Sequence, residues 1–262
     1  MRVIAALVLA PLAIATAYAG GPYWLALTCL GAIGLFVEWQ MLVKGAQPSV
    51  LGTGIFALVM IGAALNLHDV GAAVFCIPAG VLAIGSFTTQ EARFWAPAGM
   101  IYAGSALIAS VLIRQDQDLG FEALIFVLLI VWITDILGYF AGRGIGGPKL
   151  WTRVSPKKTW AGAIAGVAGS LVFASLFAWY GYGGIVPLAL LGVALSIIAQ
   201  LGDLLESAVK RHFGVKDSSH IIPGHGGLLD RLDGFVTSIV AAALIGAVRS
   251  GTDAVGHGLL IW

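Results

Sequence analysis

Residues 121–141 read FEALIFVLLIVWITDILGYFA, an apolar stretch with carboxylates only at Glu122 and Asp135. An α-helix needs about 20 apolar residues to cross the hydrocarbon core of a bilayer, and this stretch has that length. The same character extends along the chain, because 59% of the 262 residues are hydrophobic and only 10% are charged. We therefore expect residues 121–141 to form a membrane-spanning helix.

Eight further apolar runs flank this stretch, three of them short. The sequence therefore predicts an all-α, polytopic integral membrane protein with about nine transmembrane helices. Glycines are frequent inside the runs, as in membrane helices that pack closely, and they would permit a homodimer. Arg2 followed by an apolar run and Ala17-Tyr18-Ala19 also fits a cleaved signal peptide, so the first helix has two interpretations. The further runs are residues 3–18, 22–43, 49–66, 69–86, 95–113, 160–181, 185–205 and 233–249.

Polar residues are distributed unevenly along the chain. Residues 1–120 are predicted to be a transmembrane scaffold, and residues 121–262 a C-terminal transmembrane region with polar loops at 142–159 and 206–232. With the N-terminus inside, every Lys and Arg except Arg114 and Arg249 falls on one side of the membrane. The positive-inside rule then places both loops in the cytoplasm, as expected for a protein of the bacterial cytoplasmic (inner) membrane. Cys29 and Cys76 lie in apolar runs and are interpreted as packing residues.

Asp135 is a carboxylate at membrane depth, which makes it a candidate site residue. Helical spacing puts Tyr139 on the same face, with Arg143 two turns further on. The alternative is a structural pair between Asp135 and an arginine.

The loop GRGIGGPKLWTRVSPKKTW, residues 142–160, combines glycines with cations and hydroxyls. Its glycines would let backbone N–H groups approach a phosphate, with Ser155, Lys157, Lys158 and Thr159 adding hydroxyls and positive charge. The alternative is a basic patch that contacts anionic lipid headgroups.

A second polar group follows in residues 199–233. Asp203, Glu206, Ser207 and Lys210 share one helix face, and Asp230 and Asp233 are one turn apart. Such oxygen ligands suit Mg²⁺ bound together with substrate phosphates. A structural alternative is a set of salt bridges between these acids and Lys210, Arg211, Lys216 and Arg231. Zinc is disfavoured, because the region has no cysteine and its histidines are not at a standard ligand spacing.

His225 precedes Gly226 and Gly227, just before the Asp230 helix. It has three interpretations: a phosphate ligand, an acid/base group, or a hydrogen-bonded hinge residue.

The run from Ser207 to Asp233, SAVKRHFGVKDSSHIIPGHGGLLDRLD, resembles the signature of the phosphatidate cytidylyltransferases. The stretch QLGDLLES at 200–207 and the pattern from Asp135 to Trp160 are similar to the same family. Ala161 departs from it, since the family usually has an acidic or amide residue there. The resemblance covers the C-terminal half of the chain.

This resemblance implies transfer of CMP from CTP to phosphatidate, with Mg²⁺ as cofactor and the bilayer as the lipid's environment. We expect Asp203 and Asp230 to hold the metal, with Asp233 and Glu206 as further ligands. Lys210, Arg211, Lys216 and Arg231 would neutralise phosphate charge, and residues 155–159 would contribute from the facing side. The resemblance also implies that Asp217 and His225 belong to the catalytic set. The substrate-binding residues would include Asp135, Tyr139, Arg143, Ser207, Gly226 and Gly227.

Two other functions fit the same residues. One is a CTP-dependent transferase for another lipid, such as a polyprenol kinase or an ether-lipid cytidylyltransferase. The other is an ion-coupled transporter that uses Asp135, Asp203 and Asp230 as a cation path. The sequence leaves open whether a monovalent cation such as K⁺ joins the Mg²⁺, and it predicts no nucleic acid partner.

Overall fold

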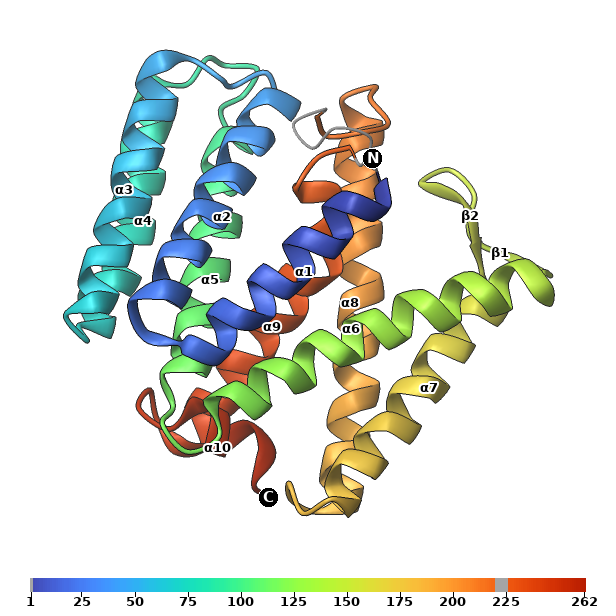
Figure 1. Cartoon of the computed structure of the whole chain (residues 1–262). Helices are drawn as coiled ribbons and strands as arrows, with labels where there is room; N and C mark the ends of the chain where they lie inside the picture. The colour runs from blue at the N-terminus through green and yellow to red at the C-terminus, as the bar shows by residue number, and fades with distance from the viewer. Residues whose placement is uncertain (1, 220–225) are drawn as a thin grey trace. The chain divides into compact units, whose positions relative to one another are not determined.

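The computed structural model describes the backbone of residues 2–219 and 226–262, and side chains from residue 11 onward in those ranges. Helices dominate this part of the chain, and a single short hairpin interrupts them (Figure 1). The elements are α1 (Arg2–Ala19), α2 (Gly21–Leu42), α3 (Pro48–Asn66), α4 (Val70–Phe87), α5 (Trp95–Gln115), α6 (Gly120–Gly144), β1 (Lys149–Trp151), β2 (Ser155–Thr159), α7 (Trp160–Trp179), α8 (Ile185–His212), α9 (Leu229–Ser250) and α10 (Val255–Leu260).

The predicted all-α membrane architecture is confirmed. Within the described residues, 8 helices, α2 to α9, are long and apolar enough to cross a bilayer. The run at 3–18 also forms a helix, α1, which contains Pro11. The nine expected runs thus each coincide with a helix, and the protein is an integral membrane protein.

The predicted loop at 142–159 differs from the structure in one respect. Helix α6 continues to Gly144, and the rest of the segment includes an antiparallel hairpin in which Lys149 pairs with Thr159 and Trp151 with Ser155. Backbone pairing therefore fixes the direction of the Ser155–Thr159 side chains, which an irregular loop would leave free.

The chain forms two compact units. The first contains residues 1–115 and 212–232, and the second contains residues 116–211 and 233–262. Helix α9 therefore begins in the first unit and continues in the second. Residues 212–219 and 226–232, which lie within the predicted C-terminal region, belong to the same compact unit as the N-terminal helices.

The first unit is built on α5, most of whose side chains are buried. Phe36, Leu58, Ile61 and Met100 fill its core from α2, α3 and α5. Some polar groups inside this unit are hydrogen-bonded across helices: the indole Nε1 of Trp24, for example, donates to the Ser110 carbonyl at 3.0 Å. This packing holds α2 in place, and with it Glu38, which α2 carries.

The second unit depends on a close approach of α6 and α7. Gly138 and Gly142 of α6 face Gly162 of α7, and a Cβ added at Gly162 would lie 2.5 Å from the Gly138 carbonyl oxygen. Small residues at such crossings let two membrane helices meet backbone to backbone. Deeper in the unit, the Thr134 hydroxyl bonds those of Ser170 and Ser196 at 2.9 and 2.7 Å, which links α6, α7 and α8.

Gly162→Ala is expected to lower the free energy of unfolding by about 1–3 kcal/mol, because the atoms it meets are backbone and cannot rotate away. The measurement is the thermal midpoint of detergent-purified protein. Gly144→Ala is the matched control, since a Cβ there meets no atom within 4 Å. Equal midpoints for the two variants would contradict the close packing of α6 on α7.

Candidate active site

A cavity of about 680 Å³ opens in the second unit. Helix α6, the β1–β2 hairpin, α7 and α8 all contribute to its lining. It gathers side chains that the sequence had singled out in three separate stretches, namely Asp135, Tyr139, Arg143, Lys157, Lys158, Thr159 and Asp203. Lys149 adds a further cation.

Helical spacing explains the α6 wall of this cavity. Asp135, Tyr139 and Arg143 follow one another at intervals of four residues and so share a face. The Arg143 guanidinium donates from Nη1 to the Tyr139 hydroxyl at 2.9 Å. Arginine and tyrosine thus form a polar arm at the end of α6, while Asp135 lies two turns deeper.

Thr159 starts α7. Its backbone is extended, and its Oγ1 accepts a hydrogen bond from the Gly162 N–H at 3.2 Å, which is the geometry of a helix N-cap. Lys158 precedes Thr159 directly on β2. The helix cap and the strand pairing together therefore fix the backbone that carries the Lys158 side chain.

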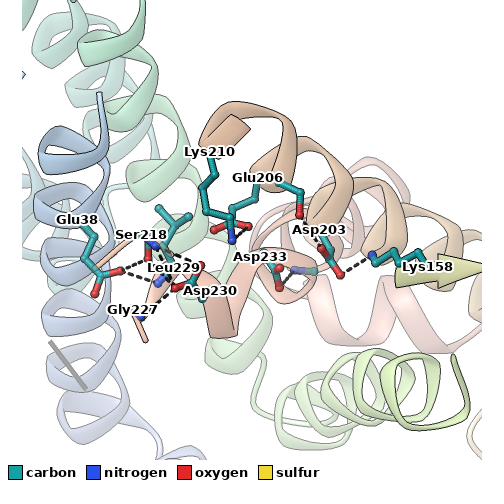
Figure 2. Close-up of polar contacts among 12 residues, drawn as sticks. Glu38, Lys158, Asp203, Glu206, Lys210, Ser218, Gly227, Leu229, Asp230 and Asp233 are labelled. Carbon is teal, nitrogen blue, oxygen red and sulfur yellow. Dashed lines mark hydrogen bonds and ion pairs between the residues drawn. The ribbon is translucent and has the colours of Figure 1, made fainter. Parts of the chain in front are cut away.

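The Lys158 ammonium forms an ion pair with the Asp203 carboxylate of α8 (Figure 2). Both side chains are about one-quarter exposed, at 27% and 28%. Asp203 also lies close enough to Asp135 and Asp233 to repel both carboxylates, and Lys158 attracts both. Three carboxylates from α6, α8 and α9 thus interact electrostatically with one another and with a single ammonium group, and this group of four has an excess of negative charge.

Helix α8 also carries a second ion pair. Lys210 lies 2.7 Å from Glu206, one turn away, and both side chains are buried. For this pair the structure shows the salt bridge that was the alternative to metal binding. Ser207 lies beside Asp203, with its hydroxyl 3.4 Å from Asp203 Oδ1.

Asp230 belongs to the first unit. Its Oδ2 accepts from the Gly227 N–H at 2.9 Å and from both the backbone N–H and the hydroxyl of Ser218 at 3.1 Å (Figure 2). The bond to Gly227, three residues earlier, resembles half of a capping box at the start of α9.

Sequence reasoning missed Glu38, a fully buried carboxylate of α2 in the same unit. It accepts hydrogen bonds from Ser218, Ser219, Leu228 and Leu229. The signal that could have found it is the one used for Asp135, namely a carboxylate inside an apolar run.

Within the described residues, the other site residues predicted from the sequence do not line the cavity. Arg211, Lys216, Asp217 and Arg231 are exposed, and Ser155 is on β2 but not in the cavity lining. Gly226 has a φ of 82°, a left-handed conformation that favours glycine. His225 lies outside the described residues.

The fit to a cation can be judged from the donor set. Among residues 2–219 and 226–262, no three Asp, Glu, His or Cys side chains converge closely enough to hold a metal in the present arrangement. Asp135, Asp203 and Asp233 nevertheless offer hard carboxylate oxygens and, together with Lys158, an excess of negative charge, and oxygen donors of this kind are those that Mg²⁺ prefers. The donor chemistry therefore fits a hard divalent cation.

Fold and site together define a polytopic membrane protein with a cavity whose lining includes the basic side chains of Arg143, Lys149, Lys157 and Lys158. Comparison with known proteins makes this specific: the model of the cytidylyltransferase family matches residues 1–248, and the chain belongs to that family.

Individual relatives agree with this assignment. The chain is 40% identical over 258 residues to the phosphatidate cytidylyltransferase of Brucella abortus biovar 1 (strain 9-941), covering 96% of this chain and 94% of the relative. It is 35% identical over 208 residues to that of Bacillus subtilis, covering 79% and 74%. It is 33% identical over 275 residues to that of Haemophilus influenzae, covering 91% and 95%. The similarity thus extends well into residues 1–120, where the sequence alone offered only hydrophobicity.

Proposed function

We propose that the protein is a phosphatidate cytidylyltransferase of phospholipid biosynthesis, which transfers CMP from CTP to phosphatidate and releases pyrophosphate. Membership of the cytidylyltransferase family and relatives named for this activity support the reaction. The observation that carries the proposal to particular residues is the cavity lined by Asp135, Lys158 and Asp203, in which Lys158 and Asp203 form an ion pair.

In this reaction an oxygen of the phosphatidate phosphate attacks the α-phosphorus of CTP. A new P–O bond forms, the bond from the α-phosphorus to the bridging oxygen breaks, and pyrophosphate carries that oxygen away. The protein's task is mainly to orient two anions and to neutralise charge. Arg143, Lys149, Lys157 and Lys158 provide four cations around the cavity for this purpose.

We assign Mg²⁺ as the cofactor. Asp203, with Asp233 and Asp135, would hold it in the second unit, and the sequence pattern adds Asp230 and Glu206 to the candidate set. When bound, the ion would stabilise the charge on the phosphate oxygens. A monovalent cation such as K⁺ is a further candidate for these carboxylates, and a homodimer remains a prediction.

The positive-inside distribution supports an inner-membrane location with the site facing the cytoplasm. CTP would then reach the cavity from water while the acyl chains of phosphatidate stay in the bilayer.

The test uses detergent-purified protein with CTP, phosphatidate and Mg²⁺. We expect CDP-diacylglycerol and pyrophosphate in equal amounts, complete loss of both with EDTA, and recovery with excess Mg²⁺. A panel of polyprenols and ether-linked phosphatidate analogues distinguishes the related lipid substrates. Turnover of a panel member but not of phosphatidate would contradict the proposed substrate, and undiminished turnover in EDTA would contradict the proposed cofactor.

A further inference from the structure

Glu38 is a charged residue in the apolar interior of the first unit. It lies on α2, has 0% of its surface exposed, and within the described residues accepts hydrogen bonds from groups 180 to 191 positions later in the chain. Its Oε1 accepts from the Ser219 hydroxyl at 2.7 Å and the Leu228 N–H at 2.8 Å. Its Oε2 accepts from the Leu229 N–H at 2.8 Å and the Ser218 hydroxyl at 3.1 Å (Figure 2).

The Ser219 hydroxyl and the Leu228 and Leu229 N–H groups already give each oxygen of this carboxylate a donor, and the Ser218 hydroxyl lies within reach as a fourth. Burying a charge without such partners is strongly unfavourable, and an apolar residue would fill the same space more easily. The arrangement therefore does more than fill the interior: it binds two backbone N–H groups at the start of α9, where the helix itself leaves such groups without acceptors.

Glu38 is linked to Asp230 through Ser218. The Ser218 hydroxyl lies 3.1 Å from both Glu38 Oε2 and Asp230 Oδ2. A hydroxyl has one proton, so it can donate to only one of the two carboxylates at a time. The Ser218 N–H also donates to Asp230, and Asp230 directly follows Leu229, whose N–H is held by Glu38. Both the backbone and the side chain of Asp230 are thus positioned by contacts that lead to Glu38.

Gly227 shows how tight this arrangement is. A Cβ at that position would lie 2.5 Å from Glu38 Oε2 and would also collide with the Ser218 hydroxyl. Since the Gly227 N–H donates to Asp230, the same glycine touches both halves of the network.

We infer that Glu38 is a positioning residue that fixes Asp230 for catalysis, although it contacts neither substrate. This inference rests on the proposed function, because Asp230 matters only if it serves the CTP-dependent reaction. It gives Glu38 a role in the reaction beyond that of a scaffold residue.

The test compares Glu38→Gln with Glu91→Gln. The first keeps the side chain's size, but its NH₂ group cannot accept a hydrogen bond, so one of the two backbone N–H groups loses its acceptor. The second makes the same chemical change at an exposed turn between α4 and α5 in the same unit. Hydrogen exchange of peptides covering 226–232 is measured by mass spectrometry, together with kcat and the Mg²⁺ concentration that gives half-maximal activity.

For Glu38→Gln we expect amide exchange over 226–232 to become about tenfold faster, since the loss of one charge-assisted bond has about that effect. We also expect a lower kcat and a raised Mg²⁺ requirement, whereas Glu91→Gln should behave as wild type. Ser219→Ala removes one of the donors to Glu38, so it should change the exchange rate, kcat and the Mg²⁺ requirement by smaller amounts. This variant replaces Glu38→Gln in the test if Glu38→Gln folds poorly.

Faster exchange with a wild-type kcat and Mg²⁺ requirement would overturn the positioning role and leave Glu38 as an anchor of structure alone. Wild-type exchange in both variants would overturn the inference entirely. If wild-type protein made no CDP-diacylglycerol, the proposed function would fail instead, and the exchange measurement would still report whether Glu38 holds the start of α9.

Discussion

Asp203→Asn is expected to lower kcat for CDP-diacylglycerol formation by about 10²–10³-fold, the effect of removing one preorganised electrostatic group from an active site. Asp203 is the carboxylate that pairs with Lys158 and also lies near Asp135 and Asp233. The amide has almost the same size, so packing should be preserved while the charge that holds Lys158, and that would bind Mg²⁺, is lost. Steady-state turnover across a range of Mg²⁺ concentrations is the measurement.

Asp253→Asn is the matched control, because Asp253 is exposed in the same unit and does not line the cavity. Both variants should elute from gel filtration as wild type does. An Asp203→Asn enzyme with near-normal kcat at every Mg²⁺ concentration would show that the cavity in the second unit is not the reaction site.

Lys158→Met is expected to have the second-largest effect, about a 10²-fold loss of kcat/KM for CTP. The substitution keeps the aliphatic stem but leaves Asp203, Asp135 and Asp233 without the ammonium that attracts all three. An incoming triphosphate would then meet more negative charge, so the KM for CTP should rise as well. Lys158→Arg should recover part of the loss, since it restores the charge.

The Asp203→Asn/Lys158→Met double variant tests whether the pair acts as a unit. Because each single change already breaks the ion pair, the two losses should combine to less than their product. Lys44→Met, the same change at an exposed residue between α2 and α3, should leave CTP kinetics unaltered. Fully multiplicative losses would mean that Lys158 and Asp203 act independently.

Much of the fold could be predicted from hydrophobicity alone. Runs long enough to cross a bilayer leave the backbone little choice but helix, and each expected run coincides with one. The Ser155–Thr159 strand was missed because its pairing with Lys149–Trp151 depends on a turn between the two strands, which periodicity within a short polar stretch cannot indicate.

The site was predictable where it depends on spacing within one helix. The i, i+4 rule placed Asp135, Tyr139 and Arg143 on one face, and all three line the cavity. Helical spacing does not predict which residue each side chain pairs with. Asp203 and Glu206 share a face of α8, yet Asp203 pairs with Lys158 across the unit and Glu206 with Lys210 on its own helix.

Glu38 shows the limit of local reasoning most clearly. Its partners lie about 180 residues further along the chain, and no spacing rule connects them. Its position inside an apolar run was a visible signal, but which N–H groups it binds depends on how α2 packs with Leu228 and Leu229.

Cytidylyl transfer is tested most directly by following two labels of CTP in the presence of phosphatidate and Mg²⁺. Transfer of CMP predicts that an α-phosphate label appears in the lipid and a γ-phosphate label appears only in pyrophosphate. A γ-label in the lipid, with CDP as the other product, would identify a kinase reaction and contradict cytidylyl transfer. If both labels stayed in CTP while the purified protein drove cation uptake into vesicles, the ion-coupled transporter would replace the enzyme.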